Sequence, residues 1–144
     1  MPLTWSRLGG VATPDKPLDS LTILVVDDDE DCLDLAASVF AAAGADVHDA
    51  LSTGEALDSF HDVHPDVVLT DVVMPDRSGI ALLREIRRSP GGHVPVVALT
   101  AYPELCRSMQ DGVEFDRVLT KPVHPEVLVD AVQDVIGGRR RTEE

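Results

Sequence analysis

The sequence of 144 residues contains no long hydrophobic run and few cysteines. Without an apolar stretch of about 18 residues, no transmembrane helix is predicted. The first 20 residues also lack the apolar core of a secretion signal. The two cysteines, Cys32 and Cys106, lie far apart and without a metal-binding spacing, which indicates neither a disulfide nor a zinc site. We therefore expect a cytoplasmic protein that does not enter a membrane.

Positive charge is scarce as well. Twelve Lys and Arg residues face 26 Asp and Glu residues, for a formal net charge of −14. Contacts with nucleic acid need clustered basic residues, so no nucleic-acid partner is expected. Only two residues are lysines, Lys16 and Lys121. The excess acid fits either a solvated surface or a cation site, and composition does not distinguish the two.

Apolar periodicity divides most of the sequence into alternating strands and helices. Short β-branched runs predict buried strands, and apolar residues at helical spacing between caps predict helices. The predicted strands are residues 21–26, 45–51, 66–73, 94–101 and 117–121. The predicted helices are residues 30–44, 52–64, 80–89, 103–112 and 124–138. In the first of these, the helical spacing of Leu35, Val39 and Ala43 predicts the apolar face. This alternation predicts an α/β fold, a parallel sheet with helices on both faces.

The two ends of the chain show no such pattern. Residues 1–20 contain several prolines and glycines, and we expect a flexible or surface-draped extension with Trp5 as its one large anchor. Residues 21–137 form the expected domain. Glycines after Ile136 predict the end of the last helix and a short tail over residues 138–144.

Polar side chains follow the predicted strands at their carboxyl ends, where open parallel sheets form their sites. Asp27 and Asp28 follow the first strand, Asp71 lies at the end of the third, Thr100 closes the fourth and Lys121 the fifth. Carboxylates about 4 Å apart repel by roughly 4 kcal/mol at an effective dielectric constant of 20, so they must pair with cations, raise their pKa values or bind metal. Oxygen ligands suit Mg²⁺. The lysine and the threonine suit phosphate oxygens.

The remaining charges near these positions have a simpler interpretation. Acids in the first turn of a helix interact favourably with its dipole. This accounts for the other acids of the first run: Asp29, Glu30, Asp31 and Asp34. The helix at 80–89 has a row of basic residues, for which a solvated face is a simpler interpretation than docking of a partner: Arg84, Arg87 and Arg88.

Four fragments in order, "VVDDD", "LTDVVMPDRSG", "ALTAY" and "LTKP", resemble the response-regulator receiver domain of two-component signalling. The resemblance covers residues 21–137 and is closest to receivers that consist of a single domain. It implies a flavodoxin-like (βα)5 fold, a doubly wound sheet of five parallel strands in the order 2-1-3-4-5.

The resemblance also implies site residues. Asp71, in the pattern D-x-x-M-P-x-x-x-G, would be the phospho-acceptor. Asp27, Asp28 and Asp71 would hold Mg²⁺, directly or through water, together with the backbone carbonyl of Val73.

Two further residues would act on the phosphoryl group. Thr100 would move toward it, and Lys121 would bridge Asp71 and the phosphate. A cis peptide bond is implied before Pro122. The family often has an aromatic residue three positions before this lysine, where this chain has Val118, so the usual coupling of that ring to the threonine is in question. Tyr102 is interpreted equally well as a flank of the site or as a surface ring.

The resemblance predicts a signalling switch. It would receive its phosphoryl group from a sensor histidine kinase or a His-phosphotransfer protein, and it would catalyse its own phosphorylation and autodephosphorylation without being a conventional enzyme. Its unidentified downstream protein would contact the face formed by residues 103–112, 117–121 and 124–138. A monomer or a phosphorylation-dependent dimer is expected.

Two other functions remain open. Asp27-x-Asp29, Thr100 and Lys121 also resemble the nucleophile, acid, hydroxyl and lysine of a haloacid-dehalogenase-type phosphatase. The sequence shows neither the cap segment nor the late acidic metal motif of that family. The phosphatase hypothesis also leaves Asp71 unexplained. The third possibility is a receiver fold that is never phosphorylated and only binds a partner.

Overall fold

The computed structural model describes residues 16–107, 109 and 112–143. Within them, strands and helices alternate along the chain. The strands are β1 (Thr22–Val26), β2 (Asp46–Ala50), β3 (Val67–Thr70), β4 (Val96–Thr100) and β5 (Arg117–Thr120). The helices are α2 (Glu30–Ala42), α3 (Thr53–Val63), α4 (Gly79–Arg88), α5 (Glu104–Arg107) and α6 (Pro125–Glu143).

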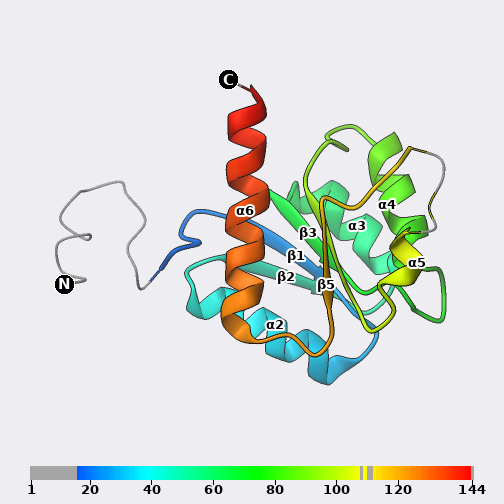
Figure 1. The fold of residues 1–144 in the computed structure, drawn as a ribbon, viewed down its shortest axis with the longest axis horizontal. Coiled ribbons are helices and arrows are strands. Elements are labelled where there is room, and N and C mark those ends of the chain that lie inside the picture. Colours follow the sequence, from blue (N-terminus) through cyan, green and yellow to red (C-terminus); the bar gives the residue numbers. More distant parts are fainter. Residues whose placement is uncertain (1–15, 108, 110–111, 144) are drawn as a thin grey trace, which may run out of the picture.

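The strands form one parallel sheet in the order β2-β1-β3-β4-β5, which confirms the predicted flavodoxin-like order. From β1 the chain passes to the edge strand β2 and then returns to β3 on the other side of β1 (Figure 1). The connections after β1 and β3 therefore leave in opposite directions. In doubly wound sheets this is the place where a crevice opens beyond the carboxyl ends of the strands.

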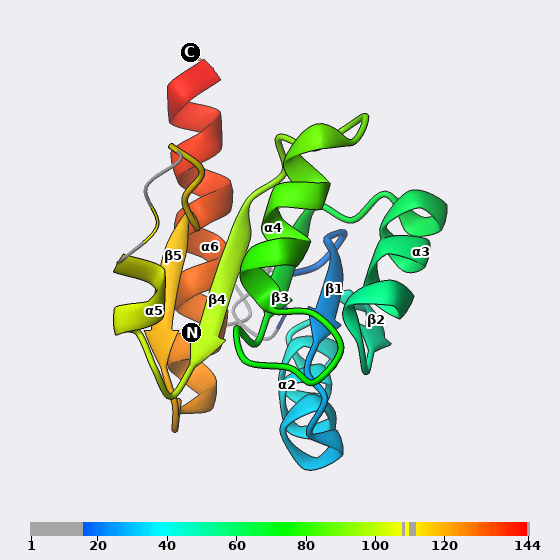
Figure 2. The same cartoon turned by 90° about the vertical axis from the view of Figure 1, so that its right-hand side faces the viewer.

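Helices cover both faces of the sheet: α2 and α6 lie on one side, and α3 and α4 on the other (Figures 1 and 2). Successive residues of a strand point to opposite faces. In β1, Ile23 joins the cluster that contains Phe40 of α2, whereas the next residue, Leu24, joins the cluster that contains Phe60 of α3. Both faces are therefore buried, which explains why the inner strands are apolar at almost every position. No helix of the described residues is both long and apolar enough to cross a membrane.

The inward face of α2 agrees with the predicted one at Ala43 and Val39 but not at Leu35. Leu33, Ala36 and Phe40 are buried, whereas Leu35 is 55% exposed. Each residue turns an α-helix by about 100°, so Leu35 lies roughly opposite Leu33. Apolar residues on more than one face made the periodicity ambiguous, and burial of the large Phe40 ring decides the orientation.

Helix α6 is longer than predicted. It continues through Gly137 and Gly138 to Glu143, so the expected tail over residues 138–144 is helical as far as residue 143. Glycine ends a helix when it adopts a left-handed conformation; in a helical conformation it costs only about 1 kcal/mol relative to alanine. A glycine pair alone is therefore a weak signal for the end of a helix. Figure 1 shows the last turns of α6 rising past the sheet.

Helix α5 is shorter than the predicted helix at 103–112, and it buries no residue fully. Met109 and Gly112 lie outside it, and Gly112 has a left-handed backbone with φ +80°. Helices in proteins are stabilised mainly by packing of an apolar face. A segment that buries so little gains little from further turns.

The end of the predicted extension packs onto the domain. Leu18 is fully buried in the cluster between the sheet, α2 and α6, and its N–H donates to the carbonyl of Ala43 at 2.9 Å. Gly44 has φ +102°, and a Cβ there would approach the Cβ of Lys16 to 2.9 Å. Glycine is thus required both by the turn and by the chain that crosses it. Trp5 lies outside the described residues.

Candidate functional site

Side chains singled out from the sequence lie beyond the carboxyl ends of neighbouring strands. Asp27 follows β1 and Asp71 follows β3, and the N–H of Asp71 donates to the carbonyl of Val26 at 2.9 Å. Thr100 is the last residue of β4 and Lys121 follows β5, with the N–H of Lys121 donating to the Thr100 carbonyl at 2.8 Å. The parallel register thus brings segments that are distant in sequence to one edge of the sheet.

Lys121 lies between two carboxylates. Its Nζ is 2.9 Å from Oδ2 of Asp27 and 3.3 Å from Oδ2 of Asp71. The Oδ1 atom of Asp27 accepts a hydrogen bond from the N–H of Asp29 at 2.9 Å, and Oδ1 of Asp71 accepts one from the N–H of Val72 at 2.7 Å. Each carboxylate is therefore oriented by a backbone N–H on one oxygen and by the lysine on the other.

Burial and charge shift the pKa values of this group. Partial burial raises the pKa of Asp71, and the charge of Asp27 adds to that effect, while Lys121 and the Val72 N–H oppose it. Burial alone would lower the pKa of Lys121, but the hydrogen bond and charge of Asp27, with the charge of Asp71, outweigh it and raise that pKa. The lysine is thus firmly cationic, whereas the charge on Asp71 is poorly compensated.

The acidic residues meet closely enough to hold a metal ion. Asp27, Asp28 and Asp71 each offer a carboxylate oxygen, and these oxygens lie within 4.8 Å of one another, the one such cluster in the part of the chain that the structure describes. Three negative groups face one lysine, which leaves negative charge uncompensated. A set of hard oxygen donors with excess negative charge fits a divalent cation such as Mg²⁺. Val73, expected to add a carbonyl, follows in the loop after β3.

Thr100 is fully buried, and its Oγ1 accepts a hydrogen bond from the N–H of Tyr102 at 2.9 Å. The hydroxyl is thus engaged with the loop after β4. Tyr102 itself is 52% exposed. The Lys121–Pro122 peptide bond is cis, as predicted.

Sequence reasoning missed the role of Gly79, the last residue of the D-x-x-M-P-x-x-x-G pattern. A Cβ at this position would lie 2.1 Å from the carbonyl oxygen of Asp71, and the N–H of Gly79 donates to the carbonyl of Val72 at 2.8 Å. The start of α4 therefore closes directly against the backbone of the acidic residue. The motif contained this signal, because a glycine at a fixed distance from an acid indicates a close backbone approach.

Sequence reasoning also missed a link between the loop after β3 and the start of α3. Oδ2 of Asp76 accepts hydrogen bonds from the N–H groups of Thr53, at 3.0 Å, and Gly54, at 3.4 Å. The hydroxyl of Thr53 donates in turn to the carbonyl of Arg77 at 2.9 Å. These partners are more than 20 residues apart, and no local sequence signal connects them.

Asp29 is the N-cap residue of α2, which agrees with its interpretation as an acid at the start of a helix. Its side chain accepts hydrogen bonds from the N–H groups of Asp31, at 3.0 Å, and Cys32, at 3.4 Å, and so caps the helix. The hydrogen bond from the Cys32 N–H, and to a smaller extent that from the Asp31 N–H, lowers the pKa of Asp29. The capping residue therefore has a structural role that needs no metal.

Arg87 does not belong to a solvated face. Its Nη1 donates to the carbonyls of Gly92 at 2.6 Å and Val94 at 2.7 Å, and its Nη2 donates to Oδ2 of Asp116 at 3.0 Å. The side chain reaches from the last turn of α4 over the loop that leads to β4. Position within a helix could not reveal this, because the partners lie on other segments.

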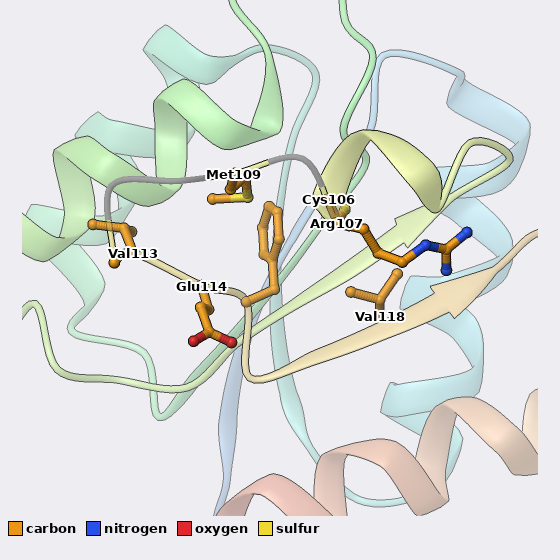
Figure 3. Close-up of a pocket in the computed structure, with 8 residues that line it drawn as sticks. Cys106, Arg107, Met109, Val113, Glu114 and Val118 are labelled. Atoms are coloured by element: carbon orange, nitrogen blue, oxygen red, sulfur yellow. The ribbon is translucent and has the colours of Figure 1, made fainter.

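Two hollows flank the last strands. One, of about 390 Å³, lies beside Lys121 between α2 and α6 and has mostly apolar walls that include Leu35, Leu99 and Leu128. The other, of about 340 Å³, lies at α5 and β5 and is lined partly by Val118 and Arg107, which Figure 3 shows near each other. Val118 is 38% exposed. This small side chain occupies the position at which the family often has an aromatic ring.

The fold and this cluster define a class of protein: a flavodoxin-like α/β domain with an acidic pocket and one lysine at the switch point of its sheet. The chain belongs to the response regulator receiver domain family, whose sequence pattern matches residues 23–133. Membership supports a phospho-acceptor role in two-component signalling.

Curated relatives agree with this assignment. The chain is 39% identical over 120 residues to an uncharacterized 14.6 kDa protein of Leptolyngbya boryana, covering 82% of this chain and 92% of that protein. It is 42% identical over 83 residues to the regulatory protein AtoC of Escherichia coli and 35% identical over 124 residues to the phosphate regulon transcriptional regulatory protein PhoB of Pseudomonas aeruginosa. These matches cover 58% and 84% of this chain, but only 18% of AtoC and 52% of PhoB.

Solved structures show the same fold. A response regulator receiver domain protein from Clostridium thermocellum is similar with a TM-score of 0.76 and 30% identity, over 85% of this chain and 98% of that one. The chemotaxis response regulator CheY4 of Vibrio cholerae has a TM-score of 0.73 and 28% identity, over 80% and 98% of the two chains.

Proposed function

We propose that Asp71 accepts a phosphoryl group and that the domain is a signalling switch controlled by this modification. The observation that carries the proposal is the position of Lys121, whose Nζ is within hydrogen-bond distance of both Asp27 and Asp71 in a cluster of three acids. Family membership supplies the reaction class, and the geometry supports the choice of residue.

Asp71 suits the acceptor role better than Asp27. A backbone N–H and Lys121 hold the oxygens of both carboxylates, but the side chain of Asp27 is only 4% exposed. The side chain of Asp71 is 12% exposed, so it is more accessible to a donor, and its raised pKa indicates a carboxylate poorly stabilised in its ionised form. Converting that carboxylate to an acyl phosphate moves negative charge outward, toward the lysine.

The proposed transfer is a direct displacement. A carboxylate oxygen of Asp71 forms a bond to phosphorus while the bond from phosphorus to the histidine nitrogen of the donor breaks, and the electron pair remains on that nitrogen. Lys121 stabilises the charge on the phosphoryl oxygens. Thr100 would exchange its bond to the Tyr102 N–H for one to the phosphoryl group. Later, water attacks phosphorus, the bond from phosphorus to the Asp71 oxygen breaks, and inorganic phosphate leaves as the carboxylate is restored.

Asp27, Asp28 and Asp71 are the residues that would hold Mg²⁺, with the Val73 carbonyl as a further ligand. When bound, this ion neutralises charge on the transferring phosphoryl oxygens. The residues of the chain orient the acceptor: the Val72 N–H fixes one oxygen of Asp71 and leaves its other oxygen facing the lysine.

The proposed donor is a sensor histidine kinase or a His-phosphotransfer protein. A match of 28% identity to the hybrid signal transduction histidine kinase I of Dictyostelium discoideum, over 89% of this chain but 8% of that protein, supports a place in such a pathway. The apolar hollow beside Lys121 offers the donor a surface next to the acceptor. The downstream contact on α5, β5 and α6, the monomer or phosphorylation-dependent dimer, and the cytoplasmic location stay predictions.

The two alternatives are less well supported. In a phosphatase of the haloacid-dehalogenase type, Asp27 would be the nucleophile, yet its side chain is almost fully buried, and Asp71 would have no role. A module that only binds a partner would not need three converging acids with a lysine between two of them.

Incubation with acetyl phosphate and Mg²⁺, followed by intact mass measurement, tests the proposal. The unaltered protein is expected to gain one phosphoryl group, and Asp71→Asn is expected to gain none, because the amide is not a nucleophile. Asp58→Asn makes the same change at an exposed residue of α3 outside the cluster, and this matched control is expected to be labelled like the unaltered protein. Labelling of Asp71→Asn at the rate of the unaltered protein would contradict the proposal.

A further inference from the structure

We propose that Asp76 is a positioning residue for the phosphoryl chemistry: by linking the loop after β3 to the start of α3, it holds the backbone around Val72 and Val73 where it serves Asp71. This inference rests on the proposed function of Asp71 and deepens it. Asp76 lies five residues beyond Asp71 and is exposed at the surface.

The loop has two firm ends. At its start, the N–H of Asp71 is bonded to Val26 of the neighbouring strand. At its end, Gly79 closes against the carbonyls of Asp71 and Val72 at the first turn of α4. Between these points lies Val73, which is 49% exposed and therefore gains little from burial. Its neighbours Val72 and Met74 are buried in the core, but the residues that follow, 75–77, are exposed, so the core does not hold this second part of the loop.

Asp76 supplies the missing attachment. Its carboxylate accepts the N–H groups of Thr53 and Gly54 in the first turn of α3, where a negative charge also interacts favourably with the helix dipole. The Thr53 hydroxyl donates to the Arg77 carbonyl in the opposite direction, and Thr53 is fully buried. Two hydrogen-bonded links in opposite directions therefore fasten the loop to a helix that is packed into the core.

This attachment bears on the site because the same loop supplies two backbone groups. The N–H of Val72 orients Oδ1 of Asp71 at 2.7 Å, and the N–H of Val73 lies 3.4 Å from the same oxygen. Loss of a bond that orients a metal ligand typically lowers metal affinity by about 10- to 100-fold. Loss of the Asp76 link is therefore expected to weaken Mg²⁺ binding without removing any proposed ligand.

The test is an NMR titration of the full chain with MgCl₂, following the amide signals of Val72 and Val73. Asp76→Ala removes the acceptor and is expected to raise the half-saturating Mg²⁺ concentration about tenfold. Asp76→Asn keeps an oxygen acceptor for the same N–H groups and is expected to restore the affinity of the unaltered protein. Equal weakening in both variants would overturn the proposal, because charge rather than the link would then be responsible.

Ser52→Ala is the matched control for general destabilisation of α3. The Ser52 hydroxyl caps this helix by accepting the N–H of Glu55 at 3.2 Å, but it does not contact the loop. Its loss is expected to lower the unfolding midpoint and leave Mg²⁺ affinity unchanged. If Ser52→Ala weakens Mg²⁺ binding as much as Asp76→Ala does, the positioning role is contradicted.

The two proposals fail separately. If the unaltered protein neither binds Mg²⁺ nor takes a phosphoryl group at Asp71, the proposed function fails. If it does both and Asp76→Ala binds Mg²⁺ with unchanged affinity, the role of Asp76 alone is overturned.

Discussion

Charge is compensated at one end of the sheet and left uncompensated at the other. At the amino ends of the strands, the guanidinium of Arg87 meets one carboxylate, Asp116, and its remaining contacts are backbone carbonyls. Asp116 also accepts the N–H of Val96 at 2.7 Å, so charge and hydrogen bonds balance there. At the carboxyl ends, three carboxylates share one lysine.

This difference separates charge that stabilises the fold from charge that is available for chemistry. A balanced pair satisfied by backbone groups needs no ligand. Partial burial, with the charge of Asp27 adding to it, raises the pKa of Asp71, so the ionised carboxylate is costly at the edge where the site lies. The excess negative charge of the cluster attracts a cation. The comparison can be tested by removing charge from each end in turn.

The largest effect is expected from Lys121→Ala. It leaves the buried Asp27 without its cation, and breaking a buried ion pair typically costs about 3 kcal/mol or more of unfolding free energy. Urea unfolding measures this loss. A double variant that also carries Asp27→Asn is expected to recover part of it, because the stranded charge is removed. A loss of the same size in both variants would mean that the lysine stabilises the fold by packing rather than by charge.

Arg87→Met, at the other end of the sheet, is expected to cost about 2 kcal/mol, because it removes three hydrogen bonds from a charged donor and leaves Asp116 unpaired. Phosphoryl labelling with acetyl phosphate should proceed at the rate of the unaltered protein. Loss of labelling in a variant that remains folded would contradict the claim that charge at the amino ends serves only the fold.

The smallest effect concerns Asp71 and pH. Because the pKa of Asp71 is raised in the fold, its ionised form destabilises the protein at pH values above that raised pKa, and the penalty disappears as pH falls through it. Asp71→Asn is therefore expected to unfold at a slightly higher temperature than the unaltered protein at neutral pH. The gap should close as pH is lowered toward the ordinary pKa of an aspartate. Thermal unfolding between those limits measures it, and a gap that widens with acid would contradict the sign.

The sequence predicted much of this architecture because its signals are local. Strands buried on both faces read as apolar runs, and alternation with helices implies a parallel sheet, so the residues after each strand had to meet. Two predictions are wrong for local reasons: the glycines at 137 and 138 do not end α6, and Leu35 is exposed rather than on the inward face of α2. What sequence could not provide was contact between distant segments. The link from Asp76 to Thr53 and the hydrogen bonds of Arg87 join different segments of the chain, and hydrophobic periodicity does not encode such contacts.

The central claim is that the uncompensated charge at the carboxyl ends belongs to one phospho-acceptor, Asp71. The most direct test is to label the unaltered protein with acetyl phosphate and Mg²⁺, trap the acyl phosphate by reduction with borohydride, and map the modified peptide by mass spectrometry. Modification is expected at Asp71 alone. Modification at Asp27 or Asp28, with Asp71 unmodified, would contradict the assignment of the phospho-acceptor.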